Sequence, residues 1–193
     1  MRVEPAKPRF LISRSGTALT VSVPARRNWF VLIFLTAWLG GWTVGGAAAV
    51  GQLLRPDPGP DRAFMLFWLI GWLCGEIYAI AIVVWQLAGR EELAFVGSSL
   101  RHRVAAAGLG RSREFDGAEI KDLRAAPQLS NPWMDQTRWM PPVFGAGHGA
   151  IAFDYGAKTY RIGAALDEAE ARLILVEVYK QFPRMIEGKK SAT

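Results

Sequence analysis

Two long apolar segments, separated by a short polar turn, dominate the hydropathy pattern of the chain. Residues 29–54 and 63–88 each run for 26 residues with few polar side chains. Between them lies the sequence Arg-Pro-Asp-Pro-Gly-Pro-Asp-Arg, residues 55–62. A helix needs about 20 apolar residues to cross the hydrocarbon core of a bilayer. The pattern therefore predicts a transmembrane helical hairpin over residues 28–89.

Small residues recur at intervals of four along both apolar segments. Spacing of four places such residues on one face of a helix, where they let two backbones approach closely in lipid. The pattern predicts that the two small-residue ridges form the antiparallel contact inside the hairpin, with a homodimer interface as the alternative. The ridge residues are Gly41, Gly45 and Ala49 in the first segment and Gly71, Gly75 and Ala79 in the second.

One acidic residue, Glu76, lies near the centre of the second apolar segment. An ionised carboxylate at that depth costs about 2.5 kcal/mol or more, and such residues usually face a bundle interior or a pathway. Thr43, Trp42 and Trp72 lie at a depth from which they can reach it. Three interpretations follow: a protonated Glu76 hydrogen-bonded inside the hairpin or to another subunit, a polar contact with a partner protein, or a proton or ion pathway.

Outside the hairpin, short segments of alternating hydrophobicity are separated by glycine-containing turns, which is the pattern of β-strands. The pattern then changes to a helical period at residues 167–182, where Asp167 and Glu170 have the spacing of a capping box. Residues 1–27 are an N-terminal β-hairpin arm expected to join the β domain of residues 90–185, and residues 186–193 are a tail. The candidate strands are residues 9–13, 18–23, 92–96, 100–106, 110–115, 119–125, 150–154 and 158–162.

The net charge of +6 comes mostly from the N-terminal arm, which has six basic residues and one acidic residue before position 28. The positive-inside rule then places both termini in the cytoplasm. From Gly89 onward the chain has 15 basic and 13 acidic residues, a balance that does not suggest a nucleic-acid partner.

Several arginines are candidates for contact with anionic lipid headgroups or an acidic partner. They lie beside the first apolar segment and on adjacent candidate strands, where an exposed charged sheet face is the alternative. Those beside the segment are Arg26 and Arg27, and those on the strands are Arg101 and Arg103, followed by Arg111 and Arg113 on the next strand.

The stretch between residues 125 and 150 is rich in proline and aromatic residues. It exceeds the usual length of about 12–15 residues for a connection without secondary structure. Its large side chains predict docking on a membrane partner or on the bilayer surface, with packing over the β domain as the alternative. The candidate docking residues are Trp133, Met134, Trp139, Met140 and Phe144.

No catalytic, metal or cofactor site is predicted. Cys74 is the only cysteine and lies within an apolar segment. His102 and His148 lack an acidic or cysteine partner at metal-ligand spacing. The glycine-rich residues 145–149 precede a candidate strand rather than a helix, so they lack the helix N-terminus of a phosphate site. The sequence therefore predicts a protein that is not an enzyme.

Three segments carry a resemblance to bacterial membrane proteins of unassigned function that combine a two-helix hairpin with a pleckstrin-homology-like (PH-like) domain. The segments are residues 21–29 (VSVPARRNW), 89–93 (GREEL) and 153–163 (FDYGAKTYRIG). The resemblance, together with the element order, implies a small PH-like antiparallel β-barrel with a C-terminal capping helix and a hairpin inserted in or preceding it.

The resemblance implies a location in a bacterial inner membrane. It favours an accessory subunit or an assembly or scaffold factor that binds another integral membrane protein. Two alternatives remain open at this point: a module that senses anionic lipid, and an oligomeric proton or ion conductor that uses Glu76.

Overall fold

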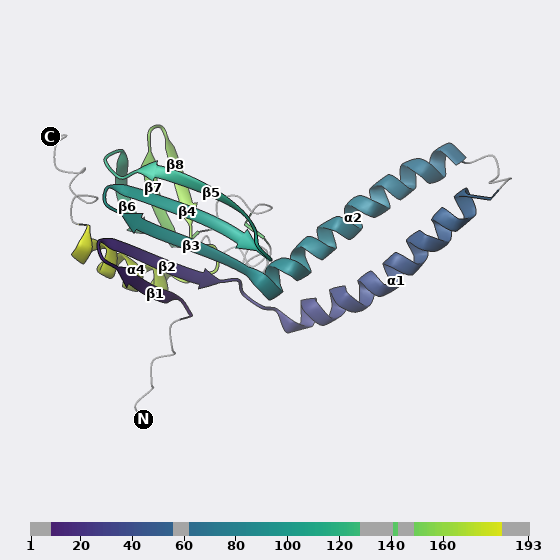
Figure 1. The fold of residues 1–193 in the computed structure, drawn as a ribbon, viewed down its shortest axis with the longest axis horizontal. Coiled ribbons are helices and arrows are strands. Elements are labelled where there is room, and N and C mark those ends of the chain that lie inside the picture. Colours follow the sequence, from purple (N-terminus) through teal and green to yellow (C-terminus); the bar gives the residue numbers. More distant parts are fainter. Residues whose placement is uncertain (1–8, 56–61, 128–140, 143–148, 183–193) are drawn as a thin grey trace, which may run out of the picture.

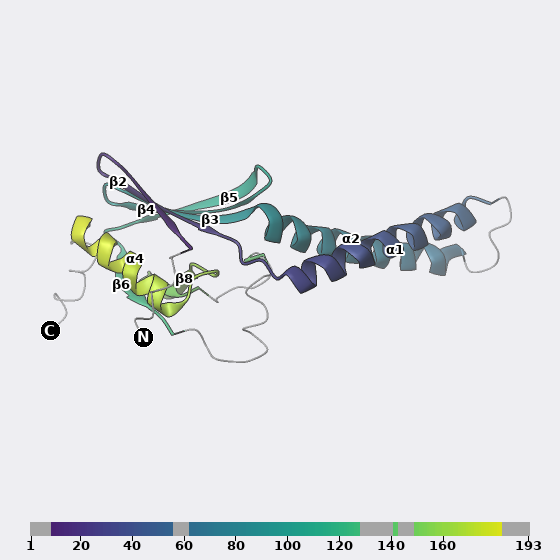
Figure 2. The ribbon, with the colours of Figure 1, turned by 90° about the horizontal axis from the view of Figure 1, so that it is seen from below.

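A helical hairpin projects from one end of a β-sheet domain (Figures 1 and 2). The computed structural model describes residues 9–55, 62–127, 141–142 and 149–182. Helix α1 is Trp29–Leu53 and helix α2 is Arg62–Ala88, so the two predicted helices are confirmed. Both are long and apolar enough to cross a membrane, and only 6% and 11% of their most apolar stretches are buried. The core helix of a soluble protein, by contrast, is mostly buried.

The two helices pack along one narrow seam. Partly or fully buried positions recur along each helix at spacings of three or four residues, and most positions between them are exposed. This heptad spacing is the packing pattern of left-handed helix pairs. The seam positions are Leu32, Leu35, Leu39, Trp42, Gly46, Ala49 and Leu53 on α1, and Met65, Leu69, Trp72, Glu76, Ala79, Val83 and Gln86 on α2.

Five antiparallel strands form a large sheet in the order β1-β2-β3-β4-β5. Strand β2 precedes the hairpin and β3 follows it, yet the two pair directly, with Val21 opposite Leu93. The hairpin is therefore an insertion between neighbouring strands, and the N-terminal strands belong to the same sheet as β3. The strands are β1 Leu11–Ser15, β2 Ala18–Pro24, β3 Gly89–Val96, β4 Ser99–Ala106 and β5 Leu109–Asp116.

Three further strands form a second antiparallel sheet in the order β6-β7-β8, and helix α4, Glu168–Gln181, follows it. The strands are β6 Ile120–Ala125, β7 Ile151–Tyr155 and β8 Lys158–Ile162.

The expectation of a closed β-barrel is wrong for the part of the chain that the structure describes. Strand β5 leads into β6 without pairing with it. Strand β1 pairs with β2 on one side only, so its other side is an open edge of the sheet. Helix α4 lies along the open side of the domain, beside β1 and against β6 (Figure 2). The strands and α4 therefore form an antiparallel two-sheet domain with a C-terminal helix.

The core lies between the large sheet, the small sheet and α4. Alternating residues of β2 and β3, such as Val21 and Leu93, are fully buried on its inner face. From the other side come Phe153 of β7 and Ile174 of α4, both with no exposed surface. Because β2 and β3 bury alternate residues, the side chains between those residues lie on the opposite face of the sheet.

Helix α4 begins as the sequence predicts. The Asp167 side chain accepts a hydrogen bond from Glu170 N, and the Glu170 side chain accepts one from Asp167 N, which completes the capping box. Near its end, the Tyr179 hydroxyl donates to Leu123 O of β6 at 2.5 Å. Burial raises the pKa of Tyr179, and the nearby Asp122 adds to the effect. These contacts fix α4 against the small sheet.

Candidate functional site

Two tryptophans lock the helices together near the middle of the hairpin. The Trp42 and Trp72 rings stack with centroids 4.0 Å apart. Trp42 Nε1 donates to Trp72 O and Trp72 Nε1 donates to Trp42 O, each at 3.2 Å. Because both indole N–H groups are satisfied by the opposite helix, the pair is a reciprocal clasp. Sequence reasoning placed both indoles near Glu76 and missed that they bind each other.

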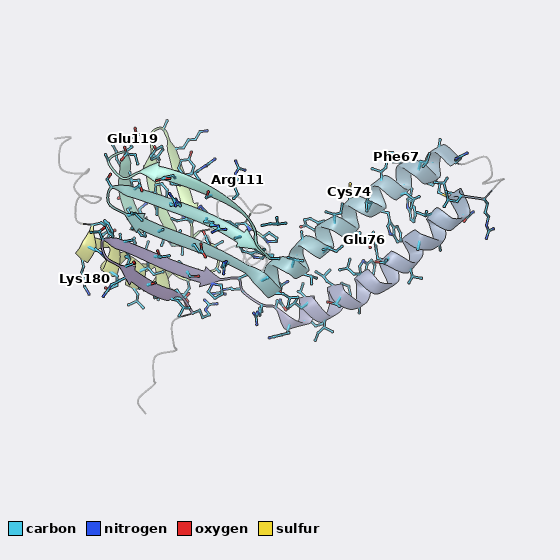
Figure 3. All side chains as sticks on the ribbon, viewed as in Figure 1. Phe67, Cys74, Glu76, Arg111, Glu119 and Lys180 are labelled. Carbon is cyan, nitrogen blue, oxygen red and sulfur yellow. The ribbon has the colours of Figure 1, made fainter. Side chains whose placement is uncertain are left out.

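Glu76 lies next to this clasp on the side of α2 that faces α1, whereas Cys74 lies on the opposite side (Figure 3). Thr43 Oγ1 donates a hydrogen bond to Glu76 Oε1 at 2.6 Å. The predicted partnership of these two residues is therefore present in the structure. Thr43 is exposed and Glu76 is half-buried, so the pair lies at the edge of the seam rather than inside it.

The predicted contact between two small-residue ridges needs a correction. A Cβ atom added at Gly41 or Gly71 would meet nothing within 4 Å, so neither glycine lies against the other helix. A Cβ at Gly45 would lie 3.2 Å from the Trp72 ring, and one at Gly75 would lie 3.3 Å from the Trp42 ring. The glycines make room for indole rings rather than for a second backbone, because the clasp fills the space between the helices.

Alanine substitutions at glycines of α1 are expected to separate these two arrangements. A Cβ at Gly46 would lie 3.0 Å from Trp72 Nε1, so Gly46→Ala crowds the clasp. We expect a loss of about 1–3 kcal/mol from crowding, set against a gain of up to about 1 kcal/mol in helix propensity. Gly41→Ala keeps the gain without the crowding. Thermal unfolding in detergent, with the exciton-coupled circular dichroism of the stacked indoles, measures both variants.

Equal stability and equal indole signals in the two variants would contradict the clasp.

The predicted ridge residues Ala49 and Ala79 lie on the seam, where both are half-buried.

A row of aromatic rings continues from the clasp along the outside of the hairpin. Trp38 lies 5.5 Å from Trp42, and Trp68 lies 4.4 Å from Trp72, between ring centroids. Trp38 is 50% exposed and Trp68 is 40% exposed. The row thus runs from the seam to the surface of both helices.

The junction between helices and sheet is held by polar contacts. Asn28 caps α1 by accepting a hydrogen bond from Val31 N at 3.2 Å, while its own N–H donates to Gln86 Oε1 at 2.7 Å. Gln86 is buried, and its Nε2 lacks a hydrogen-bond partner in the described part of the chain. Arg27 donates to Leu87 O at 3.3 Å. Arg27 therefore fastens the start of α1 to the end of α2.

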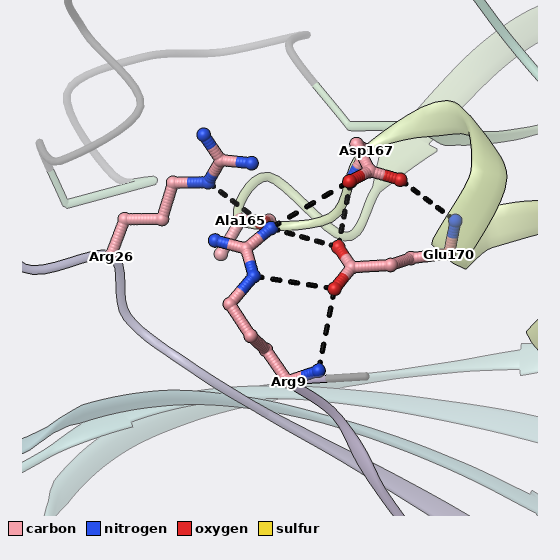
Figure 4. A network of polar contacts seen from close by, with 5 residues as sticks. All are labelled: Arg9, Arg26, Ala165, Asp167 and Glu170. Carbon is pink, nitrogen blue, oxygen red and sulfur yellow. Dashed lines mark hydrogen bonds and ion pairs between the residues drawn. The ribbon is translucent and has the colours of Figure 1, made fainter. Parts of the chain in front are cut away.

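Arg9 and Arg26 reach across to the loop before α4 (Figure 4). Arg9 Nη2 lies 2.9 Å from Glu170 Oε2, and Arg9 Nε donates to Glu170 Oε1 at 3.2 Å. Arg26 Nε donates to Ala165 O at 3.1 Å. The N-terminal segment is therefore tied to α4, and Arg26, a predicted headgroup contact, also has this structural role.

The ion pair between Arg9 and Glu170 predicts an acid-sensitive contribution to stability. Burial by itself raises the pKa of Glu170, but hydrogen bonds from Arg9 and Asp167 outweigh it, and the pKa lies below its ordinary value of 4.5. A carboxyl whose pKa is lowered on folding stabilises the fold above its unfolded pKa, and this stabilisation is lost as pH falls through the folded pKa.

We therefore expect Arg9→Ala to be less stable than the wild type at neutral pH, with a difference that shrinks as pH falls below 4.5. Urea unfolding over that pH range measures it. The control is Arg172→Ala, which removes an exposed pair with Glu168 on the same helix. A difference for Arg9→Ala that is constant with pH would refute the linkage.

The two predicted arginines of β4, Arg101 and Arg103, lie beside carboxylates on the outer face of the large sheet. Arg101 Nη2 is 3.3 Å from Glu114 Oε2, and Arg103 Nη1 is 3.9 Å from Glu92 Oε2. Arg113 is the register partner of His102, so it points to the opposite face from Arg101. The arginines of β4 and β5 therefore do not form one basic surface, because alternation sends the two sets to opposite sides.

A buried carboxylate that sequence reasoning missed connects the two sheets. Glu91 of β3 is 3% exposed and accepts hydrogen bonds from Gly163 N at 2.7 Å and Ala164 N at 3.0 Å. His102 Nε2 lies 2.7 Å from the same carboxylate. Sequence reasoning considered only partners of His102 at metal-ligand spacing and therefore missed this contact. Glu91 shares a face with Leu93 and Phe95, a signal that marked it as inward-facing.

The candidate docking residues Trp133, Met134, Trp139, Met140 and Phe144 lie outside the described residues, and so does His148. Among the residues that the structure describes, no group of three or more His, Cys, Asp or Glu side chains could hold a metal ion.

No protein family matches the chain, and no curated protein matches it. What this molecule can do therefore has to follow from its own geometry, above all from the inserted hairpin and its junction with the large sheet.

Proposed function

We propose that this is a non-enzymatic integral membrane protein that holds its two-sheet domain at a bilayer surface and binds another membrane protein there, as an accessory subunit or scaffold factor. One observation carries the proposal: the hairpin is inserted between the paired strands β2 and β3. Residues 25–28 alone connect β2 to α1, and α2 continues into β3 without a linker. Two such connections hold a domain in one place, which suits a scaffold.

The dimensions of the helices support membrane crossing. At about 1.5 Å per residue, α1 and α2 are roughly 38 and 40 Å long, longer than the ~30 Å of hydrocarbon in a bilayer. Two crossings return the chain to the side on which it started, so the sheet domain and both chain ends lie on one side. The basic N-terminal arm favours the cytoplasmic side of a bacterial inner membrane.

The pair of Thr43 and Glu76 supports a partner inside the membrane. The hydrogen bond between them leaves polar atoms at the edge of the seam, at a depth where lipid cannot solvate them. A helix of another membrane protein that hydrogen-bonds this pair would relieve that cost. The aromatic row beside the pair offers a large apolar contact for the same helix.

Native-membrane extraction of the tagged chain in mild detergent, followed by native-gel sizing and mass spectrometry, tests the proposal. We expect one stoichiometric membrane-protein partner, lost in the double variant Thr43→Val with Glu76→Leu. The matched control is Cys74→Leu, on the face of α2 away from α1 (Figure 3). A chain recovered alone, or a complex unchanged by the double variant, would overturn the proposed partner site.

The two alternatives predict different results. Sensing of anionic lipid predicts that charge reversal at Arg101 and Arg103 weakens binding to vesicles. Both arginines already lie beside carboxylates, so the structure supports lipid sensing less than partner binding. Conduction predicts that Glu76→Gln abolishes ion flux, whereas a scaffold would keep its partner. The two apolar segments of one chain contain a single acidic residue, Glu76, which is few for a proton or ion pathway.

A further inference from the structure

The turn between β4 and β5 lies at the end of the large sheet where the helices begin. Ala107 has a φ of 48° and Gly108 a φ of 84°, so the reversal is tight. In the register of the sheet, Gly89 is opposite Ala106, and Ala106 is opposite Leu109. The turn therefore lies level with the first residue after α2, as both ribbon views show (Figures 1 and 2).

The composition of this turn is unusual for a sheet domain. Residues 104–109 read Val-Ala-Ala-Ala-Gly-Leu, an uncharged run where turns normally carry polar residues. Leu109 is 81% exposed, more than Phe30 at 79% on the apolar helix α1. The β1–β2 and β3–β4 turns at the opposite end of the sheet contain Ser-Gly-Thr and Gly-Ser-Ser instead. Of the three turns between strands of the large sheet, the β4–β5 turn beside the helices is the one without serine or threonine, and it forms an apolar tip.

Position determines what covers this tip. Neighbouring strands lie about 4.8 Å apart, so Leu109 on β5 is roughly 10 Å sideways from Gly89 on β3, at the same level. If α2 leaves the hydrocarbon at Ala88, that level is the headgroup layer of the bilayer. The tip therefore meets lipid without any movement of the domain.

Arginines flank the tip. Arg111 is two residues from Leu109, is exposed, and lacks an ionic partner among the residues described. Arg90 is also exposed, although it pairs with Glu92 at 3.2 Å. An open hollow of about 230 Å³ separates the turn from the end of α2 and is lined by Ala88, Arg90 and residues 105–108. Cations beside an apolar tip are the usual composition of a segment that lies in a membrane interface.

We propose that the β4–β5 turn is a third membrane contact, in which Leu109 enters the interfacial layer of the bilayer and Arg111 and Arg90 contact lipid phosphates. This inference rests on the proposed membrane crossing of α1 and α2. With the two helix connections it makes three points of contact, and three points define a plane. The large sheet is then held at one fixed tilt to the membrane, which sets the face that it offers to a partner.

Depth-dependent fluorescence quenching tests this contact. In the Cys74→Ser background, Leu109→Cys, Val96→Cys and Leu73→Cys are labelled with the environment-sensitive dye NBD in full-length protein. The vesicles contain phosphatidylcholine and phosphatidylglycerol with a nitroxide either near the headgroup, which reports position 109, or near the end of the acyl chain, which reports position 73 in the middle of α2. Val96, at the far end of the sheet, controls for the affinity of the dye itself, and Leu73, exposed on α2, reports the crossing.

We expect the label at position 109 to be blue-shifted and quenched several-fold more than the label at position 96. If it matches position 96 while position 73 is quenched, the turn stays in water, and this inference fails while the crossing stands. If position 73 is not quenched either, the proposed membrane crossing itself fails.

A charge reversal tests the role of the cation separately. Arg111→Glu should reduce the quenching at position 109 in vesicles with phosphatidylglycerol, because it replaces attraction to anionic headgroups by repulsion. Pure phosphatidylcholine vesicles provide the control, in which the effect should be smaller. Equal quenching with and without Arg111→Glu in both vesicles would refute the proposed phosphate contact.

Discussion

Glu91→Ala is expected to lower the free energy of unfolding of the sheet domain by about 3–5 kcal/mol, the size of loss seen when one member of a buried charged contact is removed. Glu91 accepts hydrogen bonds from the backbone N–H groups of Gly163 and Ala164 and contacts His102. Without the carboxylate, a buried backbone donor on Gly163 and a half-buried one on Ala164 lose their acceptors, and a buried loss of this kind costs about 1–3 kcal/mol.

Glu91→Gln separates charge from shape. The amide keeps one acceptor oxygen and places an NH₂ group where the second oxygen accepted a hydrogen bond, so one of the backbone N–H groups of Gly163 and Ala164 loses its acceptor. We therefore expect a loss smaller than that of the alanine variant. Glu114→Ala, which removes a largely exposed carboxylate, is the matched control, since exposed ion pairs contribute about 1 kcal/mol or less.

Thermal unfolding in detergent, followed by circular dichroism in the β-sheet region, measures these variants. The order of stability should be wild type, then Glu114→Ala, then Glu91→Gln, then Glu91→Ala. If Glu91→Ala unfolds at the same temperature as the wild type, the two sheets are held together without this carboxylate.

Gly89→Ala is expected to be the second most damaging change, because Gly89 lies where α2 becomes β3. A Cβ atom at this position would lie 2.3 Å from Trp85 O and 2.5 Å from the Trp85 ring. The nearest of these atoms belongs to the backbone of α2, so no side-chain rotation removes the clash. Overpacking of this kind costs typically about 1–3 kcal/mol, and more when the backbone has to move.

The expected result of Gly89→Ala concerns geometry as well as stability. The helix end and the strand start must separate, which weakens the two-point attachment of the sheet to the hairpin. We expect faster protease cleavage near residues 86–90 in addition to a lower unfolding temperature. Gly71→Ala, on the same helix with open space around it, is the control. Equal cleavage rates in the two variants would contradict a tight junction.

Local patterns predicted the elements of this fold well. Apolar length predicted α1 and α2, alternation predicted the strands to within three residues at each end, and the Asp167 and Glu170 spacing predicted the start of α4. These features depend on periodicity within a segment or on side chains that bind their own backbone. No distant contact is needed to see them.

Patterns failed where a residue binds something far away in the sequence. The small-residue spacing predicted close backbones, but the Trp42 and Trp72 rings occupy the space, and the two lie 30 positions apart. Likewise, a search for partners of His102 at metal-ligand spacing missed Glu91, which comes from the neighbouring strand β3. The closed barrel was wrong because strand order alone does not say whether β5 pairs with β6 or only turns past it.

The sequence by itself determined that this chain has two helices with membrane-spanning length, a set of strands and a capped final helix, because hydrophobic period and capping act within a few residues. Only the tertiary structure decided that β2 pairs with β3 across the hairpin, that Glu91 meets Gly163 from 72 positions away, and that an apolar turn lies level with the end of α2. Such pairings depend on the register of strands brought together by folding, and register is set by the whole packed core rather than by either strand alone.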